Sequence, residues 1–146
     1  MRARDWRMLL LISLVALLFS SALSAQNADV VARDAWAQMP LKSKMDTALF
    51  MVVENHTPQS RTIVSVSTDA AAAAELHQMT MTKMMMVMTP VSHVAVPAKG
   101  KTSFDPNNFH VMLFGLKTRP AIGDKIHVTL KLDDGTTVPV EATVRK

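Results

Sequence analysis

Beyond residue 25, apolar and polar side chains follow one another with the period of short β-strands. Residues 125–132 are the clearest case, because every second residue from Ile126 to Leu132 is apolar and the residues between them are polar. Similar segments recur along the chain. We expect strands at residues 30–36, 47–54, 62–67, 75–79, 84–89, 92–96, 101–104, 110–116, 125–132 and 136–144.

Turn-forming residues separate these segments. Asp-Pro-Asn-Asn at residues 105–108 and Asp-Asp-Gly at residues 133–135 are typical of tight turns. Pro139 indicates that the last strand lies at a sheet edge, and the alanine run at residues 70–74 favours a helical turn. Many short strands at this spacing favour a sandwich or a barrel. We expect an all-β fold, a small antiparallel Greek-key sandwich.

The first 25 residues have the pattern of a secretory signal peptide. Arg2, Arg4 and Arg7 precede an apolar stretch at residues 8–19, and small residues follow at 20–25. We therefore expect a signal peptide at 1–25 and a single domain at 26–146 that is exported from the cytoplasm. The alternative is an uncleaved N-terminal anchor. Because no cysteine lies near the cleavage region, we do not expect a lipoprotein anchor, nor a membrane span after cleavage.

Composition excludes several classes of function. The net charge of +4 falls to roughly +2 without the signal peptide, and no dense basic run with aromatic residues suggests a nucleic-acid partner. The chain contains no cysteine, so disulfides, a cysteine nucleophile and a blue-copper site are all excluded. A Gly-x-Ser-x-Gly motif is also absent. We expect a monomer that is not an enzyme.

Two histidines and two methionines form the best candidate for a binding site. These residues are His77, Met88, His110 and Met112. Imidazole nitrogen together with neutral, soft thioether sulfur suits Cu(I), whereas Mg²⁺ and Ca²⁺ prefer carboxylates and structural Zn²⁺ prefers thiolate or more imidazole. This ligand set therefore suits a Cu(I) site.

Strand geometry allows these side chains to converge. Residues two apart on a strand share a face, so His110 should project together with Met112, and His77 with Met79. The same rule places Met84, Met86 and Met88 on one face. The alternative is that the methionines are core, since methionine fills irregular gaps well. We expect packing roles for three of them and non-ligand roles for three histidines. These residues are Met39, Met45, Met51, His56, His93 and His127.

The spacing His77-x10-Met88-x21-His110-x-Met112 matches the motif of the PCuAC family of periplasmic copper chaperones. The resemblance covers nearly the whole chain after the signal peptide. It includes residues 34–37, 48–55, 75–77, 97–100, 110–113 and 120–124. One departure is that the family often has glycines just before its Met-x-Met segment, where this chain has Lys83, Met84 and Met85. The resemblance implies a cupredoxin-like fold.

The same resemblance implies a function. It points to a protein that binds Cu(I) and delivers it to an extracytoplasmic acceptor protein, in assembly of the CuA centre of cytochrome c oxidase or in general copper handling. Two alternatives remain open at this point. One is a copper-sequestering protein without a delivery partner, and the other is a secreted β-sandwich interaction module whose methionines are only core.

Overall fold

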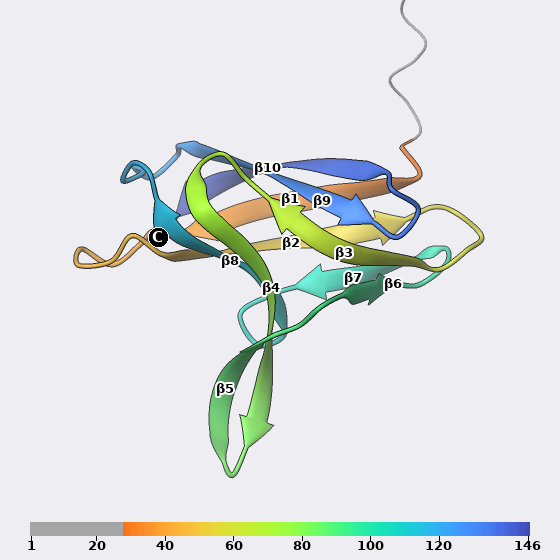
Figure 1. Ribbon diagram of the computed structural model, residues 1–146, viewed down its shortest axis with the longest axis horizontal. Coiled ribbons are helices and arrows are strands. Elements are labelled where there is room, and N and C mark those ends of the chain that lie inside the picture. Colours follow the sequence, from red (N-terminus) through yellow and green to blue (C-terminus); the bar gives the residue numbers. More distant parts are fainter. Residues whose placement is uncertain (1–27) are drawn as a thin grey trace, which may run out of the picture.

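The computed structural model describes residues 28–146, which form ten strands and, within that range, no helix (Figure 1). The expected signal peptide lies outside the described residues. The strands are β1 (Val30–Gln38), β2 (Thr47–Asn55), β3 (Arg61–Ser67), β4 (Ala71–Thr82), β5 (Met85–Pro90), β6 (Val94–Val96), β7 (Gly100–Phe104), β8 (Phe109–Leu116), β9 (Lys125–Leu132) and β10 (Thr137–Arg145). Among residues 28–146, no helix has the length and apolar composition that a membrane span requires.

The strands form one ladder that folds back on itself as a sandwich. Their order is β5-β4-β8-β7-β2-β1-β10-β9-β3-β6, and β3 and β6 return to lie beside β4 and β7. Pairing is antiparallel except between β1 and β10 and at a single β7–β8 pair. The expected all-β, cupredoxin-like sandwich is therefore confirmed, with a parallel β1–β10 pairing that the residue pattern did not indicate.

Strand alternation sorts side chains into a core face and an outer face. On β8, Val111 and Leu113 are fully buried in the core, and on β4 Leu76 joins them. Successive side chains on a strand point to opposite faces, so His110 and Met112, which alternate with Val111 and Leu113, project from the face away from the core. The candidate ligands are thus held on a sheet whose other side is a packed apolar core.

The alanine run does not form a helical turn, and this expectation is wrong. Strand β4 begins at Ala71, where Ala71 pairs with Leu116 and Ala73 pairs with Phe114 on β8. A Cβ atom placed on Gly115 would lie 3.2 Å from the Cβ of Ala72, so the strands approach closely there. Pairing with β8 overrides the helix propensity of alanine.

Strands β4 and β5 form a hairpin that projects away from the sandwich (Figure 1). Its turn contains two residues, Lys83 and Met84, both with positive φ (48° and 64°). Thr82 pairs with Met85 across this turn. The sequence pattern predicted that Met84 shares a strand face with Met86 and Met88. This prediction is wrong for Met84, which lies in the turn. Only Met86 and Met88 share that face.

Candidate metal centre

His77 and His110 are direct partners across the β4–β8 pair. Their ring centroids lie 5.8 Å apart, and their exposed fractions are only 6% and 3%. Two aromatic rings contact them from the sides: Phe114 lies 5.9 Å from the His77 ring and Phe50 lies 6.2 Å from the His110 ring. The two imidazoles are consequently buried on the outer face of the sheet.

The nitrogen Nε2 of His110 lies 2.9 Å from the sulfur of Met88. The other ring nitrogen, Nδ1, faces the backbone carbonyl of Asn108 at 3.4 Å. Because a carbonyl only accepts, we assign the ring proton to Nδ1, which donates to Asn108. The lone pair of Nε2 then faces the thioether of Met88. In this tautomer two electron-pair donors, the Nε2 nitrogen and the thioether sulfur, lie next to each other.

Burial lowers the pKa of His110 below its ordinary value, and it is the largest influence. The hydrogen bond to the carbonyl of Asn108 opposes this shift, and the neighbouring His77 adds to it. A lowered pKa keeps the imidazole neutral, and only a neutral imidazole can offer its nitrogen lone pair to a metal.

His77 presents a ligand atom of a different kind. Its Nε2 atom lies 2.9 Å from a carboxylate oxygen of Glu75, so Nε2 carries the proton and donates it to that carboxylate. Nδ1 of the same ring is buried and, among the described residues, has no hydrogen-bond partner. An unpaired buried nitrogen is costly and rare in native proteins. A metal ion bound at Nδ1 would satisfy it.

Glu75 was not among the predicted site residues, although its position in the sequence already indicated a role. It lies two residues before His77 on the same strand and therefore shares its face. A carboxylate that holds the second nitrogen of a metal-binding histidine fixes the ring and its tautomer.

Met112 completes the cluster from β8. Its register partner on β4 is Glu75, and it lines a surface pocket together with Met88 and residues of the β1–β2 connection. Met112 is half-buried, whereas Met88 is 43% exposed. The structure therefore places His77 opposite His110 and brings Met88 to His110 and to the pocket lined by Met112. Met88 is the most exposed of the four predicted ligands.

Most of the other described histidines and methionines are either exposed or packed in or against the core. His56, His93 and His127, which were not expected to be ligands, are exposed. Met51 is buried in the core, with Met39 and Met45 packed against it. The hairpin methionines are not core residues, because Met81, Met84, Met85 and Met86 are all exposed. Among residues 28–146 no three His, Cys, Asp or Glu side chains gather as a metal site.

Comparison with known proteins identifies the family of this chain and a relative of similar sequence. The profile of the family described as "Putative lipoprotein LpqE-like" matches residues 30–144. A relative named "Putative lipoprotein Lxx21020", from Leifsonia xyli subsp. xyli (strain CTCB07), is 35% identical over 101 residues. That match covers 68% of this chain and 60% of the relative, so the chain spans about three-fifths of the curated relative it matches.

Solved structures with this fold include copper proteins. The solution structure of Cu(I)-bound DR1885 from Deinococcus radiodurans is 34% identical, with a TM-score of 0.62 over 84% of this chain and 82% of that one. The copper-bound PCuAC domain of PmoF2 is 17% identical, with a TM-score of 0.67 over 81% and 93% of the two chains, and shows likeness of fold. The chain therefore belongs to the LpqE-like family, a family of PCuAC type, with which it shares its sequence over residues 30–144 and its β-sandwich fold.

Proposed function

We propose that this protein binds one Cu(I) ion through His77, Met88, His110 and Met112. In this assignment Nδ1 of His77 and Nε2 of His110 supply the two nitrogens, and the two thioethers supply the sulfurs. The ion is cargo, and the protein performs no reaction on it. The observation that carries the proposal is the convergence of the His110 nitrogen and the Met88 sulfur at 2.9 Å, together with a buried His77 nitrogen that has no hydrogen-bond partner among residues 28–146.

The choice of metal follows from the donor atoms. Thioether and neutral imidazole form a soft, uncharged ligand set that favours Cu(I) over Zn²⁺, Mg²⁺ or Ca²⁺. The Cu(I) form of DR1885, a solved relative at 34% identity, supports the same choice. Glu75, a carboxylate at the site, is hydrogen-bonded to His77.

Delivery to an extracytoplasmic acceptor follows from weak, replaceable ligands. Each thioether is a neutral donor, and Met88 lies on the exposed hairpin, so it can leave the ion first and open one position. An acceptor with thiolates would then enter there and draw the ion away. An affinity difference of about 1.4 kcal/mol shifts such an exchange tenfold. The lipoprotein names of the family and of the Leifsonia relative support an extracytoplasmic location, and we propose the periplasm. The acceptor that the family resemblance suggests is the CuA centre of cytochrome c oxidase.

The experiment is an anaerobic Cu(I) titration of the purified protein against a competing chelator, followed by X-ray absorption. We expect one tightly bound ion with mixed nitrogen and sulfur scattering. His110→Ala should abolish tight binding, and the matched control His127→Ala, which alters an exposed histidine, should leave it unchanged. A copper shell without sulfur, or equal binding by both variants, would overturn the assignment.

A sequestering protein without a delivery partner would have the same site, so a transfer assay separates the two functions. The Cu(I)-loaded protein is mixed with a reduced, soluble CuA domain, and copper is followed after separation of the two proteins. Delivery predicts transfer faster than from a small-molecule Cu(I) complex of equal affinity. Transfer at the rate of spontaneous dissociation would favour sequestration. The interaction-module alternative required the methionines to be core, and the exposed hairpin methionines do not support it.

A further inference from the structure

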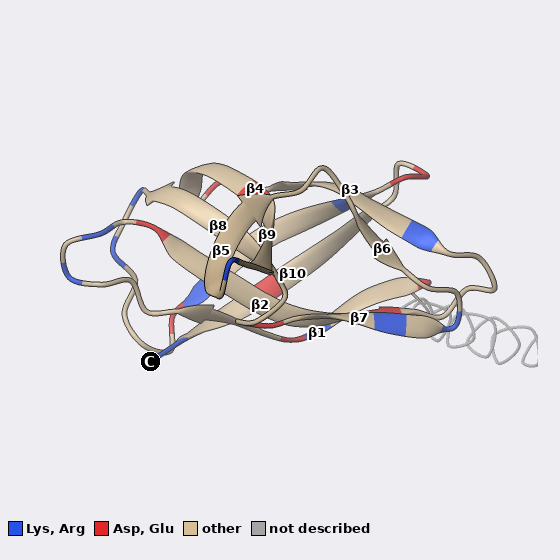
Figure 2. Cartoon of the chain, turned by 90° about the horizontal axis from the view of Figure 1, so that it is seen from below, with Lys and Arg blue, Asp and Glu red and all other residues tan. Residues whose placement is uncertain are grey.

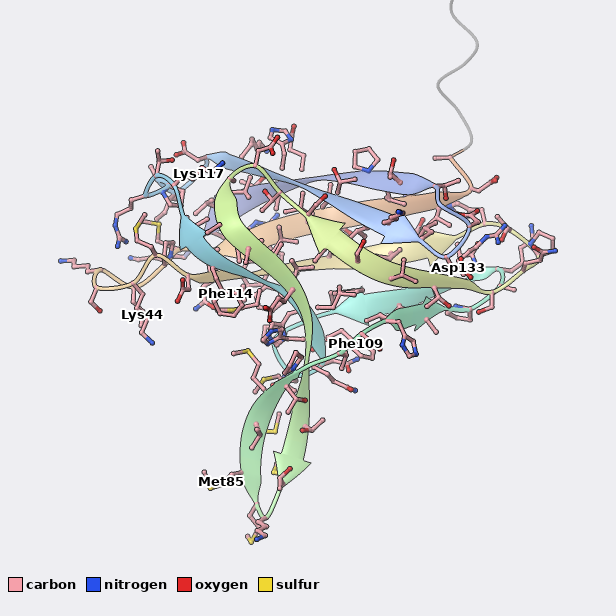
Figure 3. All side chains as sticks on the ribbon, viewed as in Figure 1. Lys44, Met85, Phe109, Phe114, Lys117 and Asp133 are labelled. Atoms are coloured by element: carbon pink, nitrogen blue, oxygen red, sulfur yellow. The ribbon has the colours of Figure 1, made fainter. Side chains whose placement is uncertain are left out.

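The register of the β4–β5 hairpin aligns four thioethers on one of its faces. Met79 pairs with Met88, and Met81 pairs with Met86, the next pair of the same face towards the tip. Directly opposed side chains on paired strands have Cβ atoms about 5 Å apart, within reach of long side chains such as methionine. These four methionines, Met79, Met81, Met86 and Met88, form a ladder that begins beside His77. Figure 3 shows sulfur atoms following the hairpin towards its tip.

Packing does not explain the ladder. Met81 is 65% exposed and Met86 is 45% exposed, on a hairpin that projects from the sandwich. β5 is also an edge strand. Exposed apolar side chains on an edge strand are an aggregation liability that proteins usually avoid with charges. Strand β5 contains no Lys, Arg, Asp or Glu (Figure 2). Exposed thioethers at this cost point to a use for their sulfur atoms.

We propose that Met79, Met81 and Met86 form a second binding site for a soft monovalent ion, Cu(I), outside the centre at His77 and His110. Three neutral thioethers would hold the ion in a three-coordinate shell of sulfur alone. The set contains no carboxylate or imidazole, so Zn²⁺ and Mg²⁺ find no suitable ligand there. Without imidazole and in contact with solvent, this site binds its ion more weakly than the four-ligand centre does.

The position of the ladder gives the second site a role that rests on the proposed function. Met88 belongs both to the ladder face and to the candidate centre, where its sulfur contacts His110. An ion on Met79, Met81 and Met86 therefore lies next to the most exposed ligand of that centre. The ladder is placed to take up Cu(I) at the hairpin and pass it inward.

The test is a titration of the purified protein with Ag(I), a redox-stable stand-in for Cu(I), followed by NMR of the methionine methyl groups. We expect a first equivalent that shifts Met88 and Met112, and a second, weaker equivalent that shifts Met79, Met81 and Met86. The double variant Met81→Leu/Met86→Leu should weaken the second equivalent by about tenfold or more and leave the first unchanged. Met85→Leu is the matched control, because Met85 lies on the same strand but pairs on the opposite face.

The outcomes separate this inference from the proposed function. Loss of the first equivalent alone in His110→Ala, with the second retained, supports two independent sites. A protein that binds only one ion, or a second ion that is insensitive to Met81→Leu/Met86→Leu, overturns the ladder site while leaving the centre intact. Equal weakening by Met85→Leu overturns it as well. A missing first equivalent with the second retained would instead refute the proposed function. Sedimentation measurements accompany the titration, and a second ion bound only between two copies of the chain would also overturn the inference.

Discussion

The Nε2 atom of His110 lies 2.9 Å from the sulfur of Met88, although the two residues are 22 positions apart in the chain and belong to different structural units. His110 is fixed on β8, whose other face is part of the packed core. Met88 is carried by the projecting hairpin. The candidate centre therefore takes one ligand from the packed sandwich and another from an exposed hairpin. The position of the hairpin decides whether the sulfur of Met88 reaches His110.

The first prediction separates the ligand set from its neighbours. Met112→Leu should lower Cu(I) affinity by about tenfold or more, because it removes a sulfur donor from the shell. Met79→Leu should retain most of the affinity of this centre, since Met79 shares the face of His77 but is not among the residues that line the pocket at Met88 and Met112. Chelator competition measures both affinities. Equal losses in the two variants would show that the proposed set is wrong.

Strand alternation predicted which candidate residues share a strand face. It placed His110 with Met112 and His77 with Met79, and the register of β4 against β8 and β5 agrees with both pairs. The period of two is reliable here because the intervening residues, such as Leu76 and Val111, are strongly apolar and bury in the core. Both same-face pairs therefore face outward as a consequence of the hydrophobic pattern.

Two further features of the β4–β5 hairpin, besides the parallel β1–β10 pairing of the sandwich, could not be derived from that pattern. The hairpin turn at Lys83 and Met84 lacks the Asn-Gly or Asp-Gly pair that usually marks a two-residue turn, so the expected strand began at Met84 instead of Met85. The strand at Ala71 was missed because alanine has high helix propensity, and only the partner strand β8 decides its conformation. The start of β4 depends on contacts with a strand that is distant in sequence, and the turn depends on a strained backbone conformation.

The second prediction concerns Glu75 as a positioning residue for His77. Glu75→Ala should lower Cu(I) affinity by about 10-fold or more, because loss of such a partner frees the ring to turn and to change tautomer. Glu75→Gln keeps an amide oxygen that can accept the Nε2 proton, so it should restore most of the affinity. Nitrogen-15 NMR of the metal-free protein provides a readout that a purely structural role would not change. It should show His77 protonated at Nε2 in the native protein and mixed tautomers in Glu75→Ala.

The third prediction concerns the strained turn. Positive φ at residues that are not glycine costs about 1 kcal/mol or more at each position. Lys83→Asn/Met84→Gly supplies the preferred residues for this turn and should stabilise the hairpin by about 1 kcal/mol. Hydrogen exchange of the β5 amides would then slow by about fivefold, because local opening of the hairpin governs their exchange. Unchanged or faster exchange in the variant would mean that the turn is not strained.

The last prediction is that acid destabilises the metal-free protein through His110. Burial holds the pKa of His110 in the folded protein below the ordinary value, whereas the unfolded chain titrates near about 6.5. Between the two pKa values only the unfolded state binds the proton, so the free energy of unfolding falls as the pH drops below about 6.5, and the loss continues until the folded-state pKa is passed. Two groups facing the ring modify the effect: His77 opposes a positive charge on it, and the carbonyl of Asn108 favours one.

Urea unfolding at about pH 8 and about pH 5 should show this loss of stability in the native protein and a smaller one in His110→Gln. His127→Gln, which alters an exposed histidine, should retain the native pH dependence. If His110→Gln lost as much stability in acid as the native protein does, another group would be responsible for the acid sensitivity.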